Sequence, residues 1–457
     1  MRLQAGDSNP VYWQLFEAVA GSAENNESSF QEHFPDAPFL KNLPVTKRYL
    51  EHWILNQLDR YRKKNIEESC LDELNRVRVW IDRRFWKKAG KELKKVYQRA
   101  IDYELFDIQL HCCRLEKQLM GQGSSPEVIE ALFQREQRCL NNLTNLNQYW
   151  LVQNRLYEIQ RRQDRTDTEL ARWGEHALLK NISAASNLQS RIFFHQAKAI
   201  YAFTKGDGIQ AMQSNQATLQ LLDENPKLIR LYPERYLSTL NNFLVDCLEA
   251  GKPELLEKGL LQLRELPARK EFNDVSDLDA RVFRQSYLLD INRVLRDKKY
   301  EAGLGFLPEL EAGLSRYGDR IARHHRLTLS YLAGYIYFLN REWVSALRLL
   351  QPLARDEKED VVLEILRYGR LLFLLVHFEL KHEELVESLL ASFRRTGKKA
   401  HKRMEVENWV LRYVRKSITH GREPLSVAEK EDLLKWKVHP EENRFFQYID
   451  LEHWLKI

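Results

Sequence analysis

The sequence is poor in the residues that make sharp turns, with only 18 glycines and 13 prolines in 457 residues. It lacks a succession of Val-, Ile- and Thr-rich segments joined by Asn-Gly or Asp-Gly turns, which is the usual pattern of β-hairpins. Leu, Arg, Glu, Lys and Gln are abundant, and these residues favour helices. The composition therefore predicts an all-α protein.

Long uncharged apolar runs are also lacking. No segment reaches the ~18 apolar residues of a membrane-spanning helix, and the N-terminal segment MRLQAGDSNPVYW has no apolar stretch typical of a signal peptide. The odd number of cysteines and the absence of CxxC spacing argue against a disulfide framework. The five cysteines are Cys70, Cys112, Cys113, Cys139 and Cys247. We expect a cytoplasmic protein that does not bind membranes.

Motifs for catalysis, cofactors and metals are lacking as well. GLGF at 303–306 has neither the third glycine nor the preceding strand of a dinucleotide site, and fits a close contact between helices better. His377 and His382 are five residues apart, which does not suit two ligands on one helix face, so we interpret them as surface or capping residues. Cys112 lies beside Cys113 on an apolar stripe, where a thiol packs as a small apolar group. We therefore expect no catalytic residue, cofactor or metal.

Two clusters of basic residues stand out against a nearly balanced charge of 71 basic and 65 acidic residues. The first cluster contains Arg83, Arg84, Lys87, Lys91 and Lys94, and the second contains Arg394, Arg395, Lys398 and Lys399. Such clusters can hold phosphates through salt-sensitive contacts. The first alternates with apolar positions, as expected for the solvated face of a helix. Both clusters are candidate contacts for an anion or a partner.

A repeated pair of helices is the main positive feature of the sequence. Residues 331–353 fit two helices with a break at Asn340-Arg341, and the small residues Gly334 and Ala346 lie where these helices would approach closely. Further units have breaks at Gly206-Asp207, at Gly251-Lys252-Pro253 and near Lys298-Lys299, and another unit spans 371–393. Spacings of about 40–45 residues indicate a helical solenoid. One pair cannot bury both of its faces, so neighbouring pairs must stack.

The segments on either side of the repeats are predicted to be caps. At the N-terminus we expect a helix over 11–20 and a packed aromatic segment with Phe30, Phe34, Phe39 and Leu40. The apolar C-terminal segment FFQYIDLEHWLKI is expected to dock on the final repeat. We divide the chain into an N-terminal cap with the first helical hairpins (1–122), long polar helices (123–186), repeats (187–397) and C-terminal capping helices (398–457).

The unit at 331–353 resembles a tetratricopeptide repeat. Gly334 and Tyr337 match the small and aromatic positions of that family's first helix, and Ala346 and Leu350 match the small and large apolar positions of its second helix. Ser330 stands where the family usually has Trp. The resemblance implies a right-handed superhelical stack of antiparallel helix pairs, an α-solenoid, with a cap at each end.

The whole chain is also similar to an uncharacterised bacterial family of long all-helical proteins. The matching positions near the start are Phe34, Pro38-Phe39, Lys41, Leu43, Val45, Lys47, Tyr49-Leu50, Ile54-Leu55 and Leu58. Members of that family end in an apolar segment with a Trp, as FQYIDLEHWL does here. This similarity implies a repeat-like fold and no known activity.

Stacked helix pairs with short breaks offer an extended surface and no catalytic loops. We therefore predict a non-catalytic scaffold that binds an unknown protein or peptide partner in a groove. The alternative is a nucleic-acid-associated or regulatory protein that uses the basic clusters at 83–95 and 394–403. An enzyme ranks third, because no group of residues meets the first requirements of an active site.

Overall fold

The computed structural model describes residues 11–21, 30, 34–61, 65–120, 124–162, 164–355, 363–396 and 404–456. Within these ranges the chain forms helices and no strand, which confirms the all-α prediction. None of the helices in these ranges is long and apolar enough to cross a membrane. The chain divides into two compact units, Met1–Glu136 and Gln137–Ile457.

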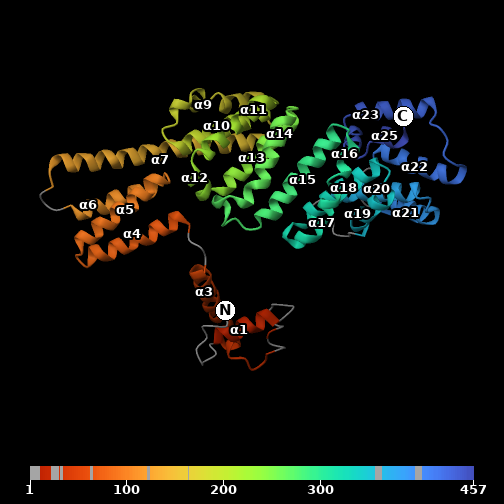
Figure 1. The fold of residues 1–457 in the computed structure, drawn as a ribbon. Helices are drawn as coiled ribbons and strands as arrows, with labels where there is room; N and C mark the ends of the chain where they lie inside the picture. Colours follow the sequence, from red (N-terminus) through yellow and green to blue (C-terminus); the bar gives the residue numbers. More distant parts are fainter. Residues whose placement is uncertain are drawn as a thin grey trace. The chain divides into compact units, whose positions relative to one another are not determined.

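Short helices make up most of the first unit (Figure 1). They are α1 (Val11–Gly21), the 3₁₀ helix η2 (Pro38–Asn42), α3 (Leu43–Tyr61), α4 (Ile66–Asp82), α5 (Trp86–Asp102), α6 (Phe106–Leu119) and the start of α7 (Pro126–Arg161). A small core joins α1, η2 and α3 through Leu15, Phe39 and Leu43. Phe30 is buried in the same core and Leu40 packs against it, whereas Phe34 is 38% exposed, so the predicted packing of the N-terminal aromatic segment is confirmed except at Phe34.

Helices α4, α5 and α6 confirm the helices predicted between residues 67 and 122. Each buries one apolar stripe, represented by Leu74 in α4, Leu93 in α5 and Ile108 in α6. Cys112 and Cys113 are both buried in α6. Burial raises the pKa of the Cys112 thiol to about 12, so this side chain packs as a protonated apolar group.

The second unit begins with the rest of α7 and continues to the C-terminal end of the described chain (Figure 1). Its further α-helices are α8 (Asp167–Gly174), α9 (Ala177–Lys180), α10 (Leu188–Lys205), α11 (Gly208–Asp223), α12 (Pro226–Leu231), α13 (Pro233–Glu249), α14 (Pro253–Glu265), α15 (Leu278–Arg296), α16 (Tyr300–Leu304), α17 (Leu307–Tyr317), α18 (Arg323–Leu339), α19 (Trp343–Arg355), α20 (Leu363–Glu379), α21 (Glu383–Thr396), α22 (Glu405–His420), α23 (Val427–Val438), α24 (Asn443–Phe446) and α25 (Leu451–Leu455). Its 3₁₀ helices are η3 (Ile182–Ala184), η4 (Leu266–Ala268), η5 (Lys270–Phe272) and η6 (Gly318–Arg320).

The long polar helices predicted over 123–186 are one long helix, α7, followed by the short helices α8 and α9. Helix α7 has 36 residues and begins at Pro126, and a proline is favourable at the first position of a helix. No glycine or proline follows Pro126 within α7, so nothing in the sequence interrupts the helix. The boundary between the two units, after Glu136, therefore falls inside a continuous helix.

The same helix-ending turn recurs through the second unit. Helices α10, α13, α15, α18 and α20 each end next to a residue with left-handed backbone, namely Gly206, Gly251, Lys298, Arg341 and Lys381. In each turn the following N–H donates to the carbonyl five residues earlier, as Glu342 does to Tyr337 at 2.9 Å. This is the Schellman motif. The first four of these positions are the breaks predicted from the sequence.

The close approach of the two helices predicted for the unit at 331–353 is confirmed. A Cβ atom placed on Gly334 in α18 would lie 2.9 Å from Cγ of Leu350 and 3.5 Å from the carbonyl oxygen of Ala346, both in α19. Gly303, in the GLGF segment, meets Ile336 in the same way, with 2.7 Å from a placed Cβ to Cγ2. These glycines allow the helices to pack at short distance.

The C-terminal segment, residues 443–455, reaches further than predicted. Its contacts with α20, where Tyr448 stacks on Tyr368 at 4.2 Å between ring centroids, agree with docking on the final repeat. It also covers α18, where the Tyr331 hydroxyl donates to the Tyr448 carbonyl at 2.7 Å. This bond satisfies a buried polar group of α18. The segment is therefore seated across the faces of two neighbouring helices rather than at the end of the last one.

Candidate functional site

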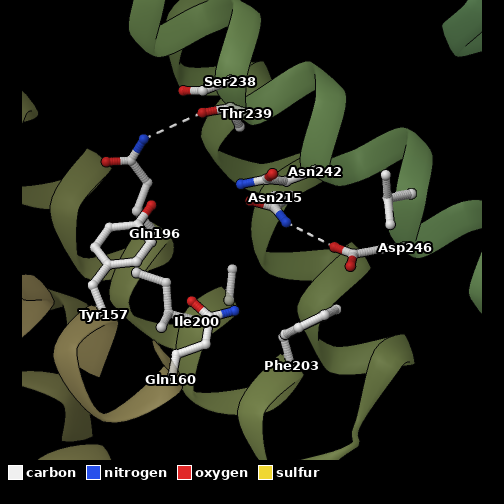
Figure 2. Close-up of a pocket in the computed structure, with 12 residues that line it drawn as sticks. Tyr157, Gln160, Gln196, Ile200, Phe203, Asn215, Ser238, Thr239, Asn242 and Asp246 are labelled. Atoms are coloured by element: carbon white, nitrogen blue, oxygen red, sulfur yellow. Dashed lines mark hydrogen bonds between the residues drawn. The ribbon is translucent and has the colours of Figure 1, made fainter. Parts of the chain in front are cut away.

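A pocket of about 170 Å³ opens in the second unit between α7, α10, α11 and α13 (Figure 2). It is lined by Tyr157, Gln160, Gln196, Ala199, Ile200, Phe203, Asn215, Ser238, Thr239, Asn242, Val245 and Asp246. Amide and hydroxyl side chains make up half of this lining, and the pocket contains a single carboxylate and two aromatic rings. Such a surface can recognise polar groups by paired donors and acceptors.

A chain of hydrogen bonds crosses three helices at one side of the pocket. Gln153 Nε2 donates to Gln196 Oε1 at 3.1 Å, and Gln196 Nε2 donates to Thr239 Oγ1 at 3.2 Å. Both pairs are separated by 43 residues in sequence. The chain thus links α7, α10 and α13 through one side chain from each helix.

Asp246 lies on the other side of the pocket and is only 3% exposed. Figure 2 shows its carboxylate beside Asn215, whose Nδ2 donates to Asp246 Oδ2 at 2.7 Å. Burial raises the pKa of Asp246 to about 6, the nearby Glu249 acts in the same direction, and the hydrogen bond from Asn215 opposes both. None of the residues that line the pocket is a lysine or an arginine. The buried carboxylate therefore has no cationic partner in the pocket.

A second buried charge lies at the other end of α13. The Arg235 guanidinium sits over the rings of Phe193 and Tyr232, at 4.7 and 4.9 Å from their centroids. Its Nη1 is buried and has no hydrogen-bond partner within the described part of the chain, and burial lowers its pKa. Arg235 and Asp246 are separated by eleven helical steps, roughly 16 Å, so these two charges cannot pair.

The first basic cluster lies in the first unit, at the turn from α4 to α5 and along α5. The side chains of Arg83, Arg84, Lys87, Lys91 and Lys94 are all exposed. The apolar positions between them are buried, so the cluster occupies the solvated face of an amphipathic helix, as its sequence pattern predicts. None of its five residues lines the polar pocket.

The second basic cluster falls largely outside the described residues. Arg394 and Arg395 are in the last turn of α21, whereas Lys398 and Lys399 lie beyond that helix and outside the described ranges.

The interpretation of His377 and His382 as surface or capping residues agrees with the exposed His382, but it is wrong for His377, which is buried in the last turn of α20. His377 is 5% exposed, and its Nδ1 lies 2.8 Å from Nδ1 of His382. The Schellman turn at Lys381 reverses the chain after α20 and brings the two rings together despite their five-residue spacing. Among the described residues no group of three or more potential ligands gathers into a metal site.

Together the fold and the pocket define an all-α protein of packed helix pairs with a polar pocket on its helix faces. Comparison with known proteins adds no relative: the chain matches no protein-family model, no curated protein and no solved structure.

Proposed function

We propose that this protein is a non-catalytic scaffold that binds an extended peptide segment of a partner protein at the pocket on α10 and α13. In this proposal the helix pairs form a right-handed stack similar to tetratricopeptide repeats, and the pocket is one part of its binding surface. The observation that supports the proposal is a contact within the chain. Residues 443–455 bind to faces of α18 and α20 that correspond to the pocket-lining face of α10.

The correspondence follows from the register of the helices. Counted back from the left-handed residue that ends each helix, Tyr331 in α18 and Gln196 in α10 both lie ten positions away. Tyr335 and Ile200 both lie six positions away. The two tyrosines bind the C-terminal segment, whereas Gln196 and Ile200 line the pocket. The corresponding helix faces thus differ: the face of α18 binds the C-terminal segment, whereas the face of α10 lines an open pocket.

The contacts on α18 also indicate how a bound segment is recognised. The Tyr331 hydroxyl donates to the carbonyl of Tyr448, and the N–H of Asp450 donates to the Tyr335 hydroxyl at 2.6 Å. Both contacts reach the main chain of the bound segment. At the position of Tyr331 the pocket has the amide of Gln196, and Asn242 of α13 adds a second amide; amides present donors and an acceptor that match a peptide main chain.

Selection of displayed peptides on the full chain tests this proposal. We expect enriched peptides to lose binding to an Asn242→Trp variant, because the new ring would fill the mouth of the pocket. A Val344→Trp variant is the matched control, since Val344 is 74% exposed on α19 and away from the pocket. Failure to enrich any peptide, or equal binding to both variants, would contradict the proposal.

The alternative function is binding of a single-stranded nucleic acid at the first basic cluster. The observation that favours it is the exposure of Phe85 and Trp86, at 60% and 49%, among the exposed basic side chains. Aromatic rings beside cations provide stacking and charge for such strands. We expect binding that weakens steeply with salt and disappears when Lys87, Lys91 and Lys94 are replaced by Glu. Unchanged binding by this triple variant would exclude the alternative.

We further propose that the protein acts in the reducing cytoplasm. All five cysteines are buried and free of disulfide bonds, and free buried thiols suit a reducing compartment. Attachment of a fluorescent protein to the full chain and imaging in its native cell would test this location.

A further inference from the structure

We propose that the polar pocket takes a cationic group, the guanidinium or ammonium of an arginine or lysine side chain, and that Asp246 is its anchor. This inference deepens the proposed function, because it names the chemistry of the peptide that the pocket selects. It rests on the placement of one carboxylate relative to its surroundings.

The first observation is that Asp246 is buried without a compensating charge. Its exposed fraction is 3%, and its hydrogen-bond partner is the neutral amide of Asn215. A buried carboxylate is costly unless it is paired, so natural proteins usually place a cation beside it. Here the residues that line the pocket provide aromatic rings, amides, hydroxyls and aliphatic groups, but no cation.

The second observation is that the position of Asp246 is unfavourable for a negative charge. It lies in the last turn of α13, which ends at Glu249, and the carbonyl end of a helix disfavours anions. Glu249 adds a like charge and contributes to the raised pKa of Asp246. Neither the place at the helix C-terminus nor the nearby Glu249 stabilises the carboxylate of Asp246. A charged group in a pocket whose position destabilises it is a candidate for ligand binding.

The third observation is that the rest of the pocket suits a cation on a long side chain. Tyr157 and Phe203 line the same pocket as Asp246, with Tyr157 on the side of Gln196 (Figure 2), and aromatic faces attract guanidinium and ammonium groups. A volume of about 170 Å³ exceeds the space needed for one water and admits the end of a side chain. Asp246 is the only carboxylate in the lining, whereas Mg²⁺ and Ca²⁺ require several oxygen ligands.

A basic side chain on a peptide fits this pocket better than a free amine. Gln196, Ser238 and Asn242 continue the polar lining away from Asp246 and can bind the main chain on either side of the inserted residue. The cation would then reach Asp246 while the main chain stays at the surface. A small free amine would leave these polar groups to water.

The test is a positional library of heptapeptides bound to the full chain, in which one position carries arginine, lysine, citrulline or glutamine. Citrulline has nearly the shape of arginine without its charge. We expect arginine or lysine to be retained at least about tenfold over citrulline, a difference of ~1.4 kcal/mol. This preference should disappear in Asp246→Asn and persist in Glu249→Gln, which removes the same charge one turn away.

The outcomes separate the inference from the proposed function. Peptides retained equally with arginine and citrulline would overturn the cationic pocket but leave peptide binding standing. A basic preference that survives Asp246→Asn would also overturn it. If no peptide is retained, the proposed function fails, and agmatine is then used as the probe. Binding of agmatine that depends on Asp246 would support a site for a free amine. If agmatine does not bind, the inference is overturned as well.

Discussion

The hydroxyl of Tyr335 accepts a hydrogen bond from the backbone N–H of Asp450 at 2.6 Å, across 115 residues of sequence. This contact belongs to a set in which the C-terminal segment satisfies buried tyrosines of α18. The side chain of Trp454 is tied to α20 in the same way, since its indole N–H donates to Glu379 at 2.6 Å. These bonds fix the segment on the helix faces and give the first prediction.

Tyr335→Phe should lower the free energy of unfolding by about 1–2 kcal/mol, because the partly buried N–H of Asp450 would lose its acceptor. Urea unfolding followed by circular dichroism measures the change. Tyr317→Phe is the control in the same unit, since the Tyr317 hydroxyl makes no hydrogen bond within the described residues, and its removal should change little. Equal effects of the two substitutions would argue against the seated segment.

The Schellman turns predict opposite effects of glycine at two positions. Arg341 has φ 64°, a left-handed conformation that costs free energy for a residue with a Cβ. Arg341→Gly should raise the free energy of unfolding by about 0.5–1 kcal/mol. Gly206→Ala should lower it by a similar amount, although there is open space around a Cβ at this position. Chemical denaturation of both variants checks the signs, and matching signs would refute the shared turn geometry.

The close helix contact at Gly334 predicts that alanine is harmful there. Alanine is the better helix former by up to about 1 kcal/mol, but its Cβ would lie 2.9 Å from Leu350. We expect Gly334→Ala to destabilise the protein by about 1–3 kcal/mol. Gly90→Ala is the matched control, because nothing lies within 4 Å of a Cβ on Gly90 in α5. That substitution should be neutral or stabilising, and thermal unfolding distinguishes the two.

The raised pKa of Asp246 predicts that replacing its carboxylate stabilises the protein by an amount that depends on pH. Burial raises the pKa from 3.8 to about 6, so the folded state holds this proton more tightly than the unfolded state. The group therefore favours folding at pH below about 4, and this contribution is lost as the pH rises through about 6.

Asp246→Asn should accordingly raise the free energy of unfolding by roughly 1–2 kcal/mol at pH 7.5, and by much less at pH 4. Urea unfolding at the two pH values measures the difference. Glu249→Gln should show a smaller gain, because that side chain is exposed and contributes less than burial to the raised pKa of Asp246. A gain from Asp246→Asn that does not vary with pH would contradict the raised pKa.

The helix breaks could be predicted from the sequence because they are local. Gly206 and Gly251 are glycines that favour the left-handed backbone, and at Lys298 and Arg341 polar residues interrupt apolar stripes. The small residue Gly334 likewise predicts a close contact between two helices, and in the structure its neighbour is Leu350. Short stretches of sequence thus predict where helices end and where they approach closely.

The pocket was missed because its residues are ordinary polar residues on four separate helices. Gln196 and Thr239 meet only through the 43-residue register of the stacked helices. Asp246 did give a local signal, since it is an acid between Val245 and Cys247 in the apolar run FLVDCL, on a stripe expected to be buried. Attention to this misplaced charge would have found the candidate site, whereas the basic clusters were conspicuous and lie elsewhere.

The C-terminal segment has a consequence for synthesis of the protein. Tyr300 donates its hydroxyl to Asp450, so Asp450 is synthesised 150 residues after its partner. Until then the C-terminal segment cannot cover the tyrosines of α18. Folding of this half of the protein is therefore completed only after translation has passed residue 455.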